Sequence, residues 1–169
     1  MAVCLFTFVD LYSKGLGTLD HILAKGAEFA ASQGVSEAEM LEWALIDDMN
    51  PLRFQAFVPI NFARQWTARA AGVAVPEDIA SDLDLAGIRA EIANAKAFLA
   101  GLTPEQFEGR DGEALNVTLG NGFSPTMPIG QWLTGFATTN FYFHLSMAYA
   151  IMRSRGVQIG KVDLFAGGL

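Results

Sequence analysis

The sequence has few cysteines, no long apolar run and no clear signal peptide. It has one cysteine, Cys4, so no disulfide can form within the chain. No run reaches the roughly 18 apolar residues that a membrane-spanning helix needs. Residues 1–9 are apolar but lack the basic start of a signal peptide. We therefore expect a cytoplasmic protein.

Basic residues are also scarce. Lys and Arg together number 11 against 18 Asp and Glu, which gives a formal net charge of -7. An acidic domain is poorly suited to bind nucleic acid or an anionic membrane surface, so neither partner is expected.

Apolar residues, in contrast, are plentiful. Hydrophobic residues make up 51% of the 169 positions and charged residues 17%, which excludes a disordered chain. The length fits a single domain over residues 1–169. So much apolar surface also favours self-association.

The apolar residues recur at helical spacing, and the chain carries matching start and stop signals. Ser36 with Glu39 forms a capping box, Asp84 can cap a helix, and glycines follow the periodic segments. Asn50-Pro51 and Pro59 should disturb the second helix. The expected elements are helices over residues 3–32, 36–71, 85–100 and 129–155, a helical turn at 103–105, and a hairpin or extended excursion over 113–127. The fold class is then all-α, a four-helix bundle.

Four polar residues lie on the predicted core faces of this bundle. On the last helix, Asn140 and His144 are one turn apart in the middle of an apolar face. On the second helix, Gln55 sits within an apolar stripe, and Asp48 precedes it by seven residues. Unpaired buried polar groups cost about 1–3 kcal/mol each, so these four side chains should meet.

Three interpretations of this cluster stay open: polar residues that fix helix register, a pocket for a small molecule, or a catalytic site. A transition metal usually needs at least three N, S or O donors, so we predict no metal or other cofactor. His144 and Asp48 are the weak candidates for a divalent-metal alternative. His21 falls on the polar side of the first helix, where solvent should surround it.

The last helix is apolar over most of its girth, which suggests a second covered face. We predict a symmetric homodimer through that face. Its residues are Phe141, Leu145, Ala148 and Met152.

Several segments carry a family resemblance: residues 48–55 (Asp-Met-Asn-Pro-Leu-Arg-Phe-Gln), 71–73 (Ala-Gly-Val), 140–144 (Asn-Phe-Tyr-Phe-His), 148–153 (Ala-Tyr-Ala-Ile-Met-Arg), 156–157 and 160–163 (Gly-Lys-Val-Asp). Over nearly the whole chain, they resemble a bacterial domain-of-unknown-function family in the DinB/YfiT-like superfamily. The resemblance implies an up-down-down-up four-helix bundle, usually dimeric and cytoplasmic, with no assigned activity.

Many proteins of that superfamily hold a divalent metal with three histidines, two of them four residues apart on the last helix. Here Asn140 stands four residues before His144, and the second helix offers Asp48 and Gln55. The leading prediction is a small-molecule pocket, or its remnant, at these four residues. The alternatives are a metal-dependent transferase or hydrolase, with His144 as ligand or base, and a structural dimer without catalysis.

Overall fold

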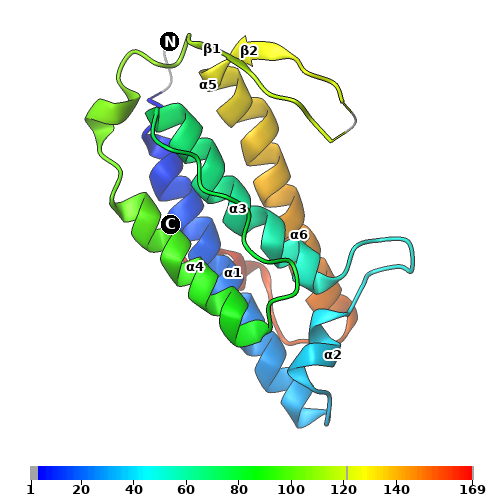
Figure 1. Ribbon diagram of the computed structural model, residues 1–169. Helices are drawn as coiled ribbons and strands as arrows, with labels where there is room; N and C mark the ends of the chain where they lie inside the picture. The colour runs from blue at the N-terminus through cyan, green and yellow to red at the C-terminus, as the bar shows by residue number, and fades with distance from the viewer. Residues whose placement is uncertain (1–3, 121, 169) are drawn as a thin grey trace.

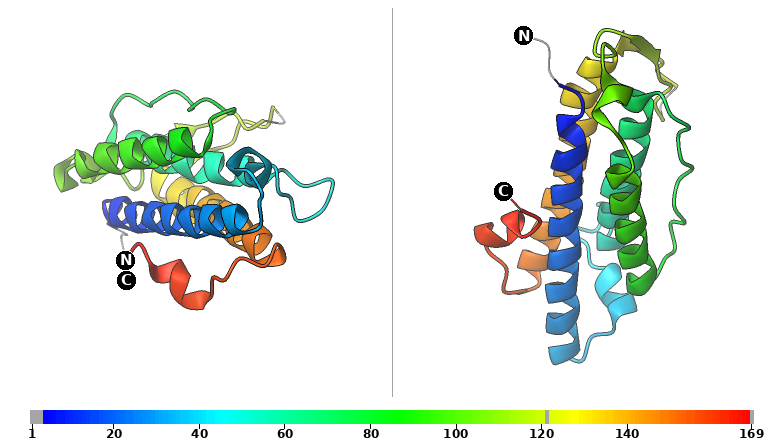
Figure 2. Two further views of the ribbon diagram at one scale, coloured as in Figure 1. Left: turned by 90° about the horizontal axis from the view of Figure 1, so that it is seen from below. Right: turned by 90° about the vertical axis from the view of Figure 1, so that its left-hand side faces the viewer.

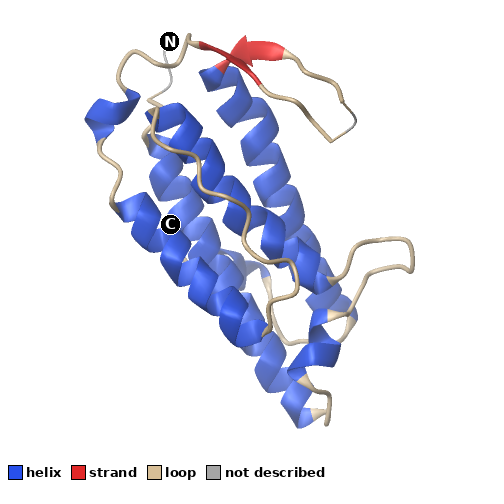
Figure 3. Ribbon diagram, in the orientation of Figure 1, coloured by secondary structure: helices blue, strands red, loops and turns tan. Residues whose placement is uncertain are grey.

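The computed structural model describes residues 4–120 and 122–168, and it is mostly helical with one two-stranded sheet (Figures 1 and 3). In those residues, no helix combines the length and the apolar character that a membrane crossing would require. The elements are α1 (Thr7–Ser32), α2 (Glu37–Leu41), α3 (Leu52–Ala71), α4 (Leu85–Ala100), η1 (Pro104–Phe107), β1 (Ala114–Asn116), β2 (Thr126–Pro128), α5 (Ile129–Gln131), η2 (Trp132–Ala137), α6 (Thr138–Ser154) and η3 (Lys161–Phe165).

Four long helical segments pack side by side. The helix α3 contacts α1, α4 and α6, and α1 contacts α4 and α6. The colour gradient of Figure 1 shows that α1 and α6 run in one direction, while α3 and α4 run in the other. The helices α3 and α4 are parallel because residues 72–84 return along the outside of α3 (Figure 2). Asn61 holds this connection, since its side-chain oxygen accepts the N–H of Ile79 at 3.0 Å.

The predicted signals at the helix ends are confirmed. Ser36 caps α2 by accepting the N–H of Glu39, and Asp84 caps α4 by accepting the N–H of Gly87. Gly72 ends α3 in the left-handed region, at φ 69°, where a side chain is rarely tolerated.

The predicted helix over residues 36–71 is wrong as one element, although the disturbance expected at Asn50-Pro51 is confirmed. It is two helices, α2 and α3, joined by an irregular loop over residues 42–51. Pro51 lies extended at the start of α3, where its missing N–H removes no hydrogen bond within the helix. The helix α3 does not end at Pro59 and continues to Ala71.

The predicted hairpin is confirmed. The strands β1 and β2 pair antiparallel, with Leu115 opposite Met127. The segment Gly120-Asn121-Gly122 is typical of a turn between two strands, and Asn121 lies outside the described residues. The indole N–H of Trp132 donates to the Leu115 carbonyl at 2.9 Å, which ties the hairpin to the start of the last helix.

The last helix follows the predicted bounds closely, but its buried face differs from the prediction. Phe141, Leu145, Ala148 and Met152, the predicted dimer face, are 0%, 3%, 0% and 0% exposed inside the chain's own core. The π-helical stretch η2 fits more residues into each turn than an α-helix, so it shifts the register that a regular wheel assumes. A dimer through these four side chains is therefore wrong, and self-association by another surface stays a prediction.

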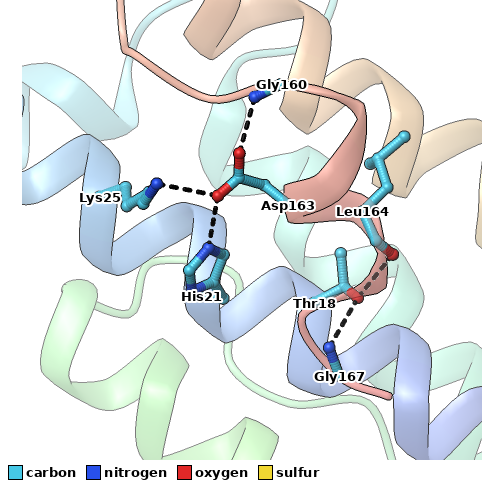
Figure 4. Close-up of polar contacts among 7 residues, drawn as sticks. All are labelled: Thr18, His21, Lys25, Gly160, Asp163, Leu164 and Gly167. Atoms are coloured by element: carbon cyan, nitrogen blue, oxygen red, sulfur yellow. Dashed lines mark hydrogen bonds and ion pairs between the residues drawn. The ribbon is translucent and has the colours of Figure 1, made fainter. Parts of the chain in front are cut away.

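The tail after α6 docks on α1 through polar contacts (Figures 2 and 4). Thr18 donates its hydroxyl to the Leu164 carbonyl at 3.0 Å and accepts the N–H of Gly167 at 3.3 Å. Asp163 accepts from Lys25 at 2.9 Å and lies 2.7 Å from a ring nitrogen of His21. The prediction that solvent alone surrounds His21 is therefore wrong. His21 and Asp163 are 142 residues apart in the sequence, so helical spacing could not pair them.

Asp163→Asn should loosen this tail. It should also make the free energy of unfolding depend less on pH in the acid range. Hydrogen bonds from Lys25, the Gly160 N–H and His21 lower the pKa of Asp163 below its usual 3.8. A lowered carboxyl pKa gives stability that is present above about pH 4 and is lost as the pH falls below it. We expect the variant to lose less stability than the wild type between about pH 5 and pH 3, in urea unfolding series.

Hydrogen exchange at neutral pH should show the same loosening, as faster exchange of the Gly167 amide in Asp163→Asn. Glu28→Gln is the matched control, because it removes an exposed carboxylate from the same face of α1 and leaves the tail contacts intact. Equal exchange in Asp163→Asn and the wild type would contradict this role of Asp163.

Candidate functional site

The structure brings together two of the four polar residues predicted to meet. Gln55 comes from the first turn of α3 and His144 from the middle of α6. The Gln55 side-chain oxygen lies 2.7 Å from Nδ1 of His144. Gln55 is 2% exposed and His144 is half-buried, so the pair reaches from the core to the surface.

A third group fixes the orientation of this pair. The Gln55 side-chain nitrogen donates to the backbone carbonyl of Asn50 at 2.8 Å. A carbonyl only accepts, so the amide oxygen of Gln55 must face His144. That oxygen also only accepts, so Nδ1 of His144 must carry the proton. The neutral ring then presents an unprotonated Nε2 with a free lone pair, as in the histidines that act as bases or ligands.

Burial keeps the ring in this neutral state. Loss of solvent lowers the pKa of His144 below its usual 6.5, because the charged form is the one that water stabilises most. The imidazole is therefore an acceptor at neutral pH rather than a cation.

Two phenylalanines flank the imidazole. Phe54 and Phe143 contact it edge to face, with ring centroids 5.7 Å and 5.1 Å from the His144 centroid. Phe54 is 36% exposed and Phe143 is 50% exposed, which is unusual for such large apolar side chains. The site thus combines one hydrogen-bond acceptor with two exposed aromatic rings.

Asp48 and Asn140 do not join the pair. Asp48 is exposed in the loop between α2 and α3, and the hydrogen bonds of Gln55 and His144 in the described part of the chain do not include it. It was placed with Gln55 on the assumption of a continuous helix, which the structure contradicts. Asn140 donates to the Phe136 carbonyl at 2.8 Å, one turn back along its own helix.

Sequence reasoning missed the other parts of this site. A regular helical wheel places Phe143 on the same core face as Asn140 and His144, and no pattern in the sequence singles out Phe54. The Asn50 carbonyl belongs to a loop that was predicted as helix. The only signal of the site is the exposure of Phe54 and Phe143 beside His144. That exposure depends on the tertiary structure, so the sequence does not show it.

The donor set does not fit the three-histidine metal site of the wider superfamily. Among residues 4–120 and 122–168, no group of three or more His, Cys, Asp or Glu side chains lies close enough together to hold a metal ion. The Gln55 oxygen faces His144, and the Asn140 amide is bonded to its own helix, so neither side chain adds an imidazole beside His144.

The lowered pKa of His144 predicts how the stability of the protein depends on pH. Between the usual pKa of 6.5 and the lower value in the folded protein, the unfolded chain binds a proton that the folded chain does not. Stability is therefore full above about pH 7 and falls as the pH drops through that window. We expect His144→Gln to lose less stability than the wild type between about pH 7.5 and pH 5.5, in paired urea unfolding curves.

The comparison with His144→Gln isolates this residue, because His21 is present in both proteins and Asp163 titrates at lower pH. Identical losses in the two proteins would show that burial does not hold His144 neutral.

Comparisons with known proteins agree with this fold. The sequence model of a family described as "Domain of unknown function (DUF1993)" matches residues 6–165. No curated protein matches the chain. Among solved structures, a crystal structure of a DinB family member protein from Shewanella denitrificans matches with a TM-score of 0.85 and 26% identity. That match covers 95% of this chain and 90% of the other. Together they confirm the resemblance that the sequence motifs carried.

Proposed function

The chain belongs to the domain-of-unknown-function family DUF1993, and we propose that it is a small-molecule-binding bundle protein whose ligand contacts His144. We further propose that its helices form the up-down-down-up four-helix bundle of the DinB/YfiT type. The opposite directions of the α1 and α6 pair and the α3 and α4 pair support that topology (Figure 1).

The observation that carries the proposal is the unprotonated Nε2 of His144. The Asn50 carbonyl and the Gln55 amide fix the ring in one tautomer, and that tautomer leaves Nε2 as a hydrogen-bond acceptor. A ligand that donates one N–H or O–H would complete the site. The exposed rings of Phe54 and Phe143 favour a flat, apolar ligand body.

Indole tests this ligand class, because it is planar and apolar and carries one N–H donor. We expect saturable binding with chemical-shift changes at the His144 ring in NMR titrations. N-methylindole lacks the donor and should bind at least about tenfold more weakly, since an unpaired buried acceptor costs about 1–3 kcal/mol.

The matched protein control is His144→Phe, which keeps an aromatic ring and removes the acceptor. Indole and N-methylindole should bind this variant equally. If indole binding does not saturate in the wild type, or if both ligands bind the wild type equally, the proposal fails.

The same nitrogen could serve as a general base, since the ring is neutral at pH 7 and half-exposed. A metal-dependent transferase or hydrolase is the weaker alternative, because the described residues contain no group of three or more His, Cys, Asp or Glu side chains that could hold a metal ion. The binding function requires neither.

A further inference from the structure

A cavity of about 330 Å³ opens between α1, α6 and the docked tail. Cavities of about 300–1,000 Å³ are typical of small-molecule sites. Its walls come from three segments that are remote in the sequence, so only the folded tail completes it.

The cavity has an apolar body. Leu11 comes from α1, Leu145 from α6, and Leu164 and Phe165 from η3. Leu145 is 3% exposed, whereas Phe165 is 46% exposed. Phe165 therefore has apolar surface left uncovered beside the cavity, which a ligand body could bury.

The rim of the cavity is polar and carries both signs of charge. Asp10 and Lys14, one turn apart on α1, form an ion pair at 2.8 Å. A charged head group would be attracted by one of these side chains and repelled by the other. A neutral group that both donates and accepts hydrogen bonds matches the pair better.

Polar contacts hold the tail wall of the cavity on α1. Thr18 anchors the chain on both sides of Phe165, through the Leu164 carbonyl and the Gly167 N–H, and Asp163 adds its contacts to α1 (Figure 4). Neither Gln55 nor His144 lines this space.

We propose that this cavity is a binding site for a small aliphatic molecule with an uncharged hydroxyl or amide head. The aliphatic body lies against the leucines and Phe165, and the head lies at the Asp10–Lys14 pair. The site is separate from the one at His144 and does not depend on it.

The probe is 1-octanol, with octanoate and octylammonium as its charged counterparts, titrated while the methyl signals of Leu11, Leu145 and Leu164 are followed by NMR. We expect 1-octanol to bind saturably and at least about fivefold more tightly than either ion. Tighter binding of one of the ions would overturn the head-group assignment, and no saturable binding of 1-octanol would overturn the site.

Variants locate the site. Leu11→Trp fills the cavity and should weaken 1-octanol binding at least about tenfold. Phe165→Ala removes part of the exposed wall without filling the core, so it keeps the test valid if Leu11→Trp folds poorly, and it should weaken binding at least about threefold. Val162→Ser is the matched control, because Val162 is 83% exposed in the same tail and does not line the cavity.

Asp163→Ala should also weaken 1-octanol binding, because it releases the wall from α1. His144→Phe should leave 1-octanol binding unchanged, which separates this site from the proposed indole site. Binding that survives both Leu11→Trp and Phe165→Ala, or that is lost in His144→Phe, would place 1-octanol elsewhere and contradict the proposal.

Discussion

Phe141→Ala is expected to lower the free energy of unfolding by about 3–5 kcal/mol, the usual cost of removing a fully buried aromatic side chain. Phe141 is 0% exposed, and its ring lies 4.8 Å from that of Tyr12. The ring also covers Gly15, where a Cβ atom would come within 2.3 Å of it. Gly15 has no side chain that could fill the space left by the ring.

Urea unfolding followed by circular dichroism measures this loss, at two protein concentrations. A core position gives the same loss at both, whereas a dimer contact would give a loss that depends on concentration. Phe143→Ala is the matched control two residues along α6, where the ring is 50% exposed, and it should cost less than about 1 kcal/mol. A small loss for Phe141→Ala would contradict the buried face of α6 described above.

Gln55→Leu is expected to lower the free energy of unfolding by about 1–3 kcal/mol and to release the ring of His144. The substitution keeps the size of the side chain but removes the hydrogen bonds to the Asn50 carbonyl and to Nδ1 of His144. Without the acceptor at Nδ1, the proton is free to move to Nε2. Indole binding should then fall at least about tenfold, because the ligand loses its acceptor.

Gln65→Leu is the matched control for this substitution. Gln65 lies three turns further along the same helix and donates to the Pro76 carbonyl and to Asp78, at the opposite end from His144. It should cost less than about 1 kcal/mol and leave indole binding unchanged. Equal effects of the two leucine substitutions would show that Gln55 does no more than any polar residue on α3.

The ends of the helices were predictable from local chemistry. Asp84 and Ser36 cap the helices that follow them, and Gly72 ends α3, because capping needs only the few residues around each end. The bounds of the last helix and the small hairpin could be predicted in the same way.

The orientation of the last helix could not be predicted, because the π-helical stretch η2 leaves no clear mark in the sequence. The wheel therefore placed Phe143 in the core and Phe141 outside it. The contacts of Asp163 with α1 were equally hidden, because they depend on where the tail returns after α6.

Half of the candidate site could be predicted from the sequence. Gln55 and His144 meet because each is a polar residue on an apolar helical face, and that pattern is local. Asp48 was misplaced because one helix was assumed where a loop interrupts two. The Asn50 carbonyl that orients Gln55 belongs to that loop, and no side-chain pattern could have identified a backbone acceptor.

The tautomer of His144 tests the central claim most directly. Two-bond ¹H–¹⁵N correlation spectra distinguish protonated from unprotonated ring nitrogens in a protein labelled with ¹⁵N-histidine. At about pH 7.5, His144 should have a protonated Nδ1 and an unprotonated Nε2, and Gln55→Leu should lose that preference. A proton on Nε2 in the wild type, or the same tautomer in both proteins, would contradict the account.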